Sequence, residues 1–254
     1  MEFSVCIISN VIDPTLIKAV TSYRTLSNDI LIGFNGLSEK EIDNFQTQYP
    51  FLKTHLLPWT GYGPTKNALA ALASHDWILS IDSDEIASTE LQRALSELRF
   101  HTMETVYCIK RAHFIGLEVI RYGTFGSEIE LKRRLYNRTK SQWDKEKVHE
   151  ALIMPATATF EVLEGILYHY TAESVAQIQL KNEQYARLSA ENMFEKGKKY
   201  SILKPYLSGF SSFMKQYIFK KGFLDGKIGY QLAKASARYA WMKYDFLKKL
   251  QQNK

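Results

Sequence analysis

"DWILSIDSDEIAS" (residues 76–88) joins an apolar run to a cluster of carboxylates. The run predicts a buried strand, and Asp82, Asp84 and Glu85 follow it directly. Carboxylates this close repel one another unless solvent, protein cations or a metal ion relieve them. In open α/β sheets, ligands bind beyond the carboxyl ends of the strands. The stretch therefore predicts a strand that ends at a functional site.

The residues before this stretch alternate between strand and helix patterns. Apolar runs predict further strands at 3–9, 29–34 and 51–57. Helix-start signals predict one helix from Asp13-Pro14 and another from Pro64 to Ala73. A third helix is predicted after Ser38, because Glu41 stands at the capping-box position. This alternation predicts an α/β fold with parallel βα units in one sheet. Shorter strand-like pieces after Phe100 predict that the sheet becomes mixed. Ser88 is the expected cap of the next helix.

The sequence becomes helical near its last third. The pattern from Ala172 onward predicts helices, and the composition divides the chain into residues 1–171 and residues 172–254. We expect the last part to be broken into short helices by Gly197, Pro205, Gly209, Gly222, Gly226 and Gly229.

Length and composition favour an ordinary globular protein. The chain has 254 residues, of which 45% are hydrophobic and 24% are charged. The two cysteines, Cys6 and Cys108, lie in apolar runs, so we expect buried free thiols and no disulfide or zinc framework. The N-terminus lacks the pattern of a signal peptide, and no apolar run is long enough to span a bilayer. We expect a cytoplasmic protein that is soluble or peripheral to a membrane.

Charge is distributed unevenly along the chain. Residues 196–254 carry a net charge of +12, whereas the preceding 195 residues carry −6. In "YLSGFSSFMKQYIFKKGFLDGKIGY" (206–230), aromatic residues alternate with lysines. This composition suits an anionic membrane interface. The alternatives are that these aromatics pack in the core beneath solvated lysines, or that the basic tail binds nucleic acid.

The acidic turn admits two interpretations. Asp82 and Asp84 could hold Mg²⁺ or Mn²⁺, which prefer oxygen ligands and can bridge a diphosphate. They could instead only cap the following helix, since a lone D-x-D is common. Three other segments carry candidate groups: "GYGPTKN" (61–67) with Lys66, "VHE" (148–150) with His149 and Glu150, and "ILYHY" (166–170) with His169.

These segments together resemble a known family. "WILSIDSDE", "GYGPTKN", "RLYNR", "VHEAL", "GILYHY" and "YIFKKGFLDGKIGYQLA" resemble bacterial family-2 glycosyltransferases, and specifically the lipopolysaccharide core β-1,4-glucosyltransferase group. The resemblance covers most of the chain. It implies a GT-A type, Rossmann-like mixed sheet with a helical basic C-terminal extension, a metal-binding D-x-D motif and inversion at the anomeric carbon.

The resemblance also implies roles for individual residues. Asp84 would contact Mn²⁺ or Mg²⁺, Asp82 would lie nearer the ribose, and His169 would complete the metal or diphosphate site. Glu150 would be the general base, and Lys66 would bind phosphate. Asn35 stands where the family commonly has an acidic residue that contacts the nucleobase. Arg133, Arg134 and His149 are candidates for phosphate or acceptor contacts, and the two arginines could equally form a solvated strand edge.

The implied activity is transfer of a hexose, with glucose the first candidate, from a nucleotide sugar. We expect a UDP-sugar donor, a lipopolysaccharide core or related glycan acceptor, and an anionic membrane surface as partners, with no nucleic acid. The expected location is the cytoplasm, at the inner face of the cell membrane. The alternatives are a nucleic-acid-binding protein that uses the basic tail and a catalytically silent scaffold with a transferase fold.

Overall fold

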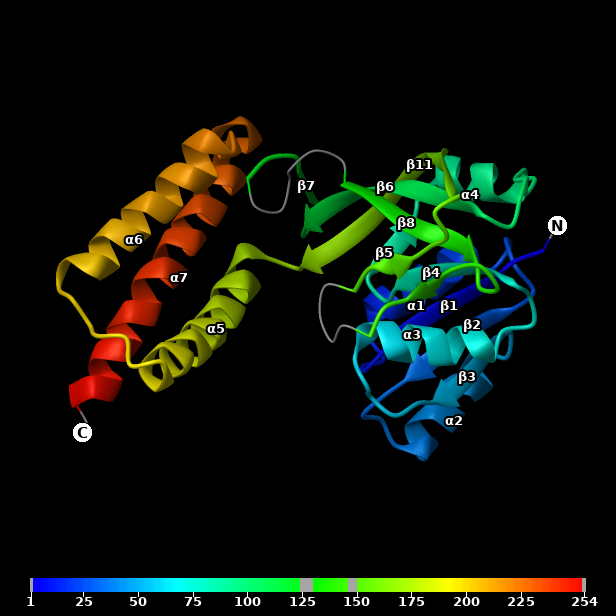
Figure 1. Ribbon diagram of the computed structural model, residues 1–254, viewed down its shortest axis with the longest axis horizontal. Coiled ribbons are helices and arrows are strands. Elements are labelled where there is room, and N and C mark those ends of the chain that lie inside the picture. Colours follow the sequence, from blue (N-terminus) through cyan, green and yellow to red (C-terminus); the bar gives the residue numbers. More distant parts are fainter. Residues whose placement is uncertain (1, 124–129, 146–149, 253–254) are drawn as a thin grey trace. The chain divides into compact units, whose positions relative to one another are not determined.

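The computed structural model describes residues 2–123, 130–145 and 150–252 (Figure 1). The contacts divide the chain into two compact units. The α/β unit comprises residues 1–111 and 130–169, and the helical unit comprises residues 112–129 and 170–254, each within the described ranges. The helical unit thus takes in residues 112–123, which the sequence analysis placed with the first 171 residues.

The α/β unit follows the order expected from the sequence and adds short strands to it. Its helices are α1 (Pro14–Tyr23), α2 (Glu39–Gln48), α3 (Tyr62–Ala71) and α4 (Thr89–Ser96). Its strands are β1 (Ser4–Ser9), β2 (Ile30–Phe34), β3 (Leu52–Leu56), β4 (Trp77–Asp82), β5 (Glu85–Ala87), β8 (Glu130–Asn137), β9 (Gln142–Trp143) and β10 (Leu152–Ile153). Two long strands, β6 (Thr105–Ile115) and β11 (Thr159–Ala172), begin in this unit and end in the other.

The main sheet is mixed, as predicted. Its strand order is β3-β2-β1-β4-β8-β6-β11-β5. The strands β3, β2, β1 and β4 are parallel, whereas β8 runs antiparallel to both β4 and β6. The register places Ile8 of β1 beside Asp82 of β4, so the two parallel strands end at the same edge. The α/β class and the mixed sheet are therefore confirmed.

Local signals in the sequence explain the helix starts. Asp13 accepts a hydrogen bond from the Leu16 amide, and Ser38 forms a full capping box with Glu41. The helix α3 begins earlier than predicted, at Tyr62. Its Pro64 lies in the first turn, where a missing amide hydrogen costs no helical hydrogen bond.

The core fills both faces of the sheet. Successive strand residues point to opposite faces, so Ile7 packs in one apolar cluster with Leu79, and Ile8 packs in another with Ile78. Both cysteines are buried and free, as expected. The parallel strands β1, β2 and β4 are buried almost throughout, which leaves their carboxyl ends as the place where their polar side chains reach solvent.

The helical unit contains β7 (Glu118–Ile120), α5 (Val175–Glu195), α6 (Leu203–Met214), a π-helical turn η1 (Lys215–Phe219), a 3-10 turn η2 (Gly222–Asp225) and α7 (Gly226–Gln252). The long helix α7 packs against both α5 and α6. None of the helices that the structure describes is both long and apolar enough to cross a bilayer.

The prediction of only short helices at the C-terminus is wrong. The helix α7 has 27 residues and runs through Gly229. A Cβ at Gly229 would clash with the carbonyl oxygen of Gly222, so this glycine allows a close backbone contact and does not end the helix. The helix boundaries predicted at Gly197 and Gly226 do occur: α5 ends just before Gly197 and α7 begins at Gly226, and the two glycines have φ of +66° and +61°.

Candidate functional site

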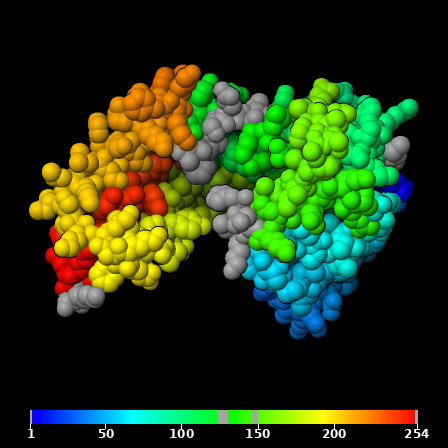
Figure 2. Space-filling model, viewed as in Figure 1, coloured from blue at the N-terminus to red at the C-terminus, as the bar shows by residue number. Residues whose placement is uncertain are grey.

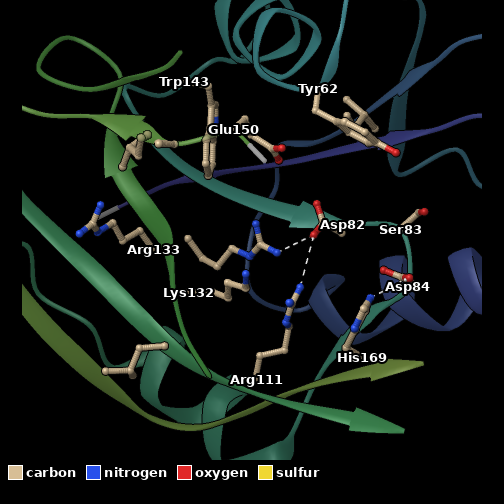
Figure 3. A pocket seen from close by; sticks show the side chains of 15 residues that line it. Tyr62, Asp82, Ser83, Asp84, Arg111, Lys132, Arg133, Trp143, Glu150 and His169 are labelled. Atoms are coloured by element: carbon tan, nitrogen blue, oxygen red, sulfur yellow. Dashed lines mark hydrogen bonds and ion pairs between the residues drawn. The ribbon is translucent and has the colours of Figure 1, made fainter. Parts of the chain in front are cut away.

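A cavity of about 740 Å³ opens at the carboxyl ends of β1 and β4 in the α/β unit (Figure 3). Its lining comes from β1, α3, the turn after β4, β6, β8, the β9–β10 region and β11. The expected D-x-D residues, Asp82 and Asp84, both line it. The position agrees with the general rule for ligand sites in open α/β sheets.

Asp82 lies beside three cations, of which Arg111 is the most distant, 4.0 Å from Oδ2, and the other two are close. Its Oδ1 lies 2.9 Å from Lys66 Nζ, and its Oδ2 lies 2.6 Å from Arg134 Nη2. Burial raises the pKa of the Asp82 carboxyl, but Arg134 and Lys66 outweigh burial and hold this pKa well below its usual range. Asp82 is therefore a carboxylate that the protein itself neutralises.

Glu85 is fully buried behind the turn. Its Oε1 accepts hydrogen bonds from Arg134 Nη2 at 2.5 Å and from Arg111 Nη1 at 3.2 Å, and its Oε2 accepts one from the Asp82 amide. The sequence placed Glu85 in the acidic cluster without assigning it a role. The structure makes it the anchor that holds Arg134 and the backbone of Asp82 in place.

Lys66 bridges two carboxylates. Its Nζ lies 2.7 Å from Glu150 Oε1 as well as 2.9 Å from Asp82, and 4.8 Å from the centre of the Trp143 ring. The side chain is only 3% exposed. The resemblance implies that Lys66 binds phosphate, and the structure places its ammonium group between the predicted general base, Glu150, and the first aspartate of the D-x-D, Asp82.

A second set of contacts fixes the chain around Glu150. The Asn67 side chain accepts a hydrogen bond from the Trp143 amide at 2.9 Å and donates one to the Trp143 carbonyl at 2.8 Å. The Asp144 amide donates to the Ala151 carbonyl at 2.9 Å. A Cβ on Gly63 would clash with the Asp144 carbonyl oxygen, so this glycine of α3 permits the close approach. The segment "GYGPTKN" thereby holds Trp143 and Asp144 beside Ala151, the residue that follows Glu150.

Asp84 differs from its neighbours. Its Oδ2 lies 2.9 Å from His169 Nε2, and Figure 3 shows the two side chains pointing toward each other. The Asp84 side chain is 38% exposed. The structure thus brings together Asp84 on the turn and His169 on β11, two residues that are 85 positions apart in the sequence.

The other carboxylates near the cavity have cationic partners. These ion pairs are Asp82 with Arg134, Lys66 and Arg111, Glu85 with Arg134 and Arg111, Glu130 with Arg111 and Lys132, and Glu150 with Lys66. Burial opposes ionisation of Glu130, but hydrogen bonds from Lys132 and Arg111 lower its pKa to about 2. Among the described residues, Asp84 pairs with His169 and with no Lys or Arg. Asp84 is therefore the carboxylate at which a further cation is electrostatically favoured.

The donor atoms at this position suit a divalent metal ion in part. No group of three or more His, Cys, Asp or Glu side chains that could hold a metal gathers within the described ranges. A carboxylate and an imidazole are nevertheless two suitable ligands. Mg²⁺ and similar ions are commonly bound by one or two protein carboxylates together with substrate phosphates and water. The pair of Asp84 and His169 fits a metal whose remaining ligands come from a diphosphate.

The remaining predicted residues lie at varied distances from this centre. Asn35 follows β2, and its side chain donates a hydrogen bond to the Ser9 carbonyl, while the residue itself is not part of the cavity wall. Arg134 is buried at the carboxylates, whereas Arg133 is exposed, stacks 5.1 Å from the Phe160 ring and points away from Asp82 (Figure 3). His149 lies outside the described residues.

Sequence reasoning missed Arg111 and Trp143, which both line the cavity. The side chain of Arg111 connects Glu85 with Glu130, and Trp143 covers the ammonium group of Lys66. A charged residue at the end of the apolar run "TVYCIK" was the available signal for Arg111. Nothing in the sequence around Trp143 marked it.

The chain is similar to known glycosyltransferases over most of its length. A curated protein of Rickettsia typhi, named uncharacterized glycosyltransferase RT0209, is 24% identical over 240 residues, which cover 90% of this chain and 80% of the relative. The lipopolysaccharide core biosynthesis glycosyltransferase LpsC of Rhizobium meliloti is 28% identical over 190 residues, or 73% of this chain and 68% of the relative. These relatives confirm the resemblance to glycosyltransferases that the sequence segments indicated.

No family model matches the chain. Among solved structures, S. aureus TarS 1-349 in complex with UDP aligns with 100% of this chain and 92% of its own, with a TM-score of 0.48 and 16% identity.

Proposed function

We propose that this protein is an inverting glycosyltransferase that moves a hexose, with glucose the first candidate, from a nucleotide sugar to a lipopolysaccharide core or related glycan. One observation carries the proposal: Asp84, the one carboxylate in the acidic turn without a Lys or Arg partner among the described residues, faces the cavity beside His169. The curated relatives named glycosyltransferases, one of them for lipopolysaccharide core biosynthesis, support the same reaction class. We take a UDP-sugar as the first donor to test.

In this proposal the chain's own residues position the reactants. Lys66 engages Oε1 of Glu150, and Oε2 of Glu150 accepts the proton of the acceptor hydroxyl. The acceptor oxygen forms a bond to the anomeric carbon as the bond from that carbon to the diphosphate oxygen breaks. The diphosphate leaves with the electron pair, and attack from the opposite face inverts the configuration.

Asp84 and His169 would hold Mn²⁺ or Mg²⁺ against the donor diphosphate. When bound, such an ion neutralises the negative charge that develops on the leaving group. Asp82 keeps a different role, because Lys66 and Arg134 already occupy both of its oxygens. We propose that it holds these two cations at the wall of the cavity, within reach of the donor ribose and phosphates.

The proposed acceptor and location remain those implied by the resemblance. A lipid-linked or core glycan would be presented at the inner face of the cell membrane, so we propose a cytoplasmic protein that works at an anionic membrane surface. The basic composition of residues 196–254 supports this partner.

The decisive test is turnover of nucleotide sugars by the purified full chain, with and without Mn²⁺ or Mg²⁺. We expect metal-stimulated release of nucleoside diphosphate with at least one UDP-sugar. Asp84→Asn should reduce turnover about a thousandfold, because it removes the negative charge that faces the donor. Glu150→Gln should bind the donor normally in a thermal-shift assay and lose turnover, because it cannot accept the proton.

Asp43→Asn is the matched control for Asp84→Asn, since Asp43 is an exposed residue of α2. Turnover should not change in this variant. Full activity of Asp84→Asn would overturn the metal-site assignment. Absence of turnover and of thermal stabilisation with every sugar nucleotide tested would instead favour the silent-scaffold alternative.

A further inference from the structure

The helix α6 exposes a stripe of large apolar side chains. Leu203, Tyr206, Leu207 and Phe210 are 66%, 65%, 63% and 67% exposed. Their spacing of three, four and seven residues places them on one face of a helix. We call these four residues the α6 face. In Figure 2, α6 (between yellow and orange on the colour bar) forms part of the outer surface of the helical unit.

The rest of α6 is occupied by packing within the helical unit. Pro205 and Gly209 are buried on the side opposite the α6 face. A Cβ on Gly209 would lie 3.3 Å from the Ala237 carbonyl oxygen, which shows how closely α6 approaches α7. The α6 face is therefore the side that α7 does not cover. An exposed contiguous apolar surface of this kind commonly marks an interaction site.

The aromatic residues of the region fall into two sets. Phe213, Tyr217 and Tyr230 pack on one another, with ring centres 5.2 to 6.0 Å apart. Tyr206 and Phe210 project from the surface, as does Phe219 after the helix, which is 76% exposed. Internal packing thus explains the first set and leaves the second without a structural role in the helical unit.

Positive charge surrounds the α6 face. Residues 196–224 contain no Asp or Glu, and they contain seven lysines: Lys196, Lys198, Lys199, Lys204, Lys215, Lys220 and Lys221. These lysines lie before, along and after α6. The apolar residues on the exposed side of α5 have different neighbours, since Leu180 and Leu188 lie on the same helix as Glu183 and Glu191. Along the sequence, an apolar face flanked by lysines alone therefore distinguishes α6 from α5.

We propose that the α6 face is a membrane-docking surface that lies in the headgroup region of an anionic bilayer. The apolar side chains would enter the boundary between headgroups and acyl chains, and the lysines would contact lipid phosphates. Each lysine near an anionic surface contributes about 1 kcal/mol of attraction. The inference rests on the membrane partner of the proposed function and deepens it by naming the helix and the side chains that make the contact.

The test is flotation of the full chain with vesicles. The vesicles contain phosphatidylcholine alone or with about 30 mol % phosphatidylglycerol, at moderate salt. We expect binding only to the anionic vesicles. A double variant, Leu207→Ser with Phe210→Ser, should reduce the bound fraction at least about tenfold, because two apolar side chains no longer enter the interface. The matched control is Leu180→Ser with Leu188→Ser on α5, which should bind within about twofold of wild type.

Three other outcomes would each overturn the proposal. Equal binding of the wild type and the α6 double variant would mean that another surface binds lipid. Equal binding to both vesicle types would show that attraction between the lysines and anionic lipid does not contribute to binding. A concentration-dependent dimer in sedimentation that the α6 double variant abolishes, with no flotation, would show that a second copy of the chain covers the face. Circular dichroism and thermal unfolding of both double variants establish that they are folded.

The transferase proposal is tested separately. Asp84→Asn changes only the charge of a side chain in the α/β unit, so this variant should float as the wild type does even where it has lost turnover. A wild-type protein that turns over a soluble acceptor but does not float would overturn the docking surface alone. A wild-type protein that floats but turns over no sugar nucleotide would overturn the proposed function alone.

Discussion

The α/β unit and the helical unit depart from ordinary globular packing in opposite ways. The α/β unit buries charge, because Lys66, Glu85 and Arg134 are each less than 5% exposed. The helical unit exposes apolar surface, because the four side chains of the α6 face are each more than 60% exposed. Buried charged groups and large exposed apolar patches are the two features that demand an explanation in a globular protein. These two features lie in different units, which supports the proposals that the reaction takes place in the α/β unit and that the helical unit docks on a membrane.

The largest stability effect should come from breaking the buried ion pairs. Arg134→Leu removes the cation that lies nearest to both Glu85 and Asp82, and Glu85 is fully buried. Loss of one partner of a buried pair typically costs about 3–5 kcal/mol. We expect the free energy of unfolding in urea to fall by this amount. Arg133→Leu is the matched control, since it makes the same change at an exposed residue of β8 and should change the free energy of unfolding by less than about 0.5 kcal/mol.

If Arg133→Leu lowered the free energy of unfolding as much as Arg134→Leu, the assignment of one buried and one exposed arginine on β8 would be contradicted. The sequence does not predict which of the two arginines is buried, because Arg133 and Arg134 are adjacent in it. The alternation of a strand puts neighbouring residues on opposite faces, but only the position of Glu85 decides which of the two faces the carboxylates.

The next effect concerns the proposed reaction. Asn67→Ala removes both hydrogen bonds to the backbone of Trp143, which pairs with Leu152 of β10, two residues after Glu150. Misplacement of a reacting group by about 1 Å can lower a rate by about a hundredfold. We expect the kcat of sugar transfer to fall by about that factor, with little change in KM for the donor. Asn44→Ala on the exposed side of α2 is the control and should leave both constants unchanged. A rise in KM at constant kcat would show that Asn67 contacts the donor and does not position Glu150.

A smaller effect of about 2 kcal/mol should depend on pH. Burial raises the pKa of Asp29, but hydrogen bonds from Lys53, Ser4 and Ser74 outweigh burial and lower it from 3.8 to about 2. The folded state therefore holds Asp29 ionised more strongly than the unfolded chain does. The stability that this provides is complete above a pH of about 4 and is lost as the pH falls toward 2. Urea unfolding at several pH values measures it.

Asp29→Asn tests this assignment, since it keeps the shape of the side chain and removes its charge. At neutral pH the variant should be less stable than the wild type by about 2 kcal/mol, and the difference should shrink as the pH falls below about 4. A difference that stays constant across this range would mean that lost hydrogen bonds, and not the carboxylate charge, account for the effect. Asp43→Asn again serves as the exposed control.

The sequence was sufficient for the frame of the α/β unit. Periodic apolar runs located the strands from β1 to β4, and the caps at Asp13, Ser38 and Ser88 located three helix starts. These features depend on neighbouring residues alone. The short strand β5 was not predicted, because its three residues are a strand only through their pairing with β11, which lies about eighty positions later. Sequence reasoning failed in the same way at Gly229, whose tolerance inside α7 depends on the backbone of Gly222.

The candidate site was predictable as a set of residues but not as an arrangement. Asp82, Asp84, Lys66, Glu150 and His169 were all singled out, and the structure brings them to one cavity wall or to its immediate support. The sequence does not show that Asp82 is neutralised while Asp84 is left to face the cavity, because this depends on where Lys66 and Arg134 point. Long side chains reach across several ångströms, so their partners follow from tertiary structure and not from spacing in the sequence.

The smallest expected effect concerns an exposed leucine of the helical unit, compared with a buried one. Leu207→Ala and Leu232→Ala remove the same atoms from two helices of the helical unit, at residues that are 63% and 2% exposed. Leu232→Ala should lower the free energy of unfolding by about 2–5 kcal/mol, because it leaves a cavity. Leu207→Ala should change it by less than about 0.5 kcal/mol in the absence of lipid. Leu207 would then expose apolar surface to water without stabilising the fold, as a docking residue does. Measuring both free energies of unfolding without vesicles therefore distinguishes a docking residue from a core residue. A large loss for Leu207→Ala would mean that the α6 face packs on protein and that the exposed stripe serves the fold.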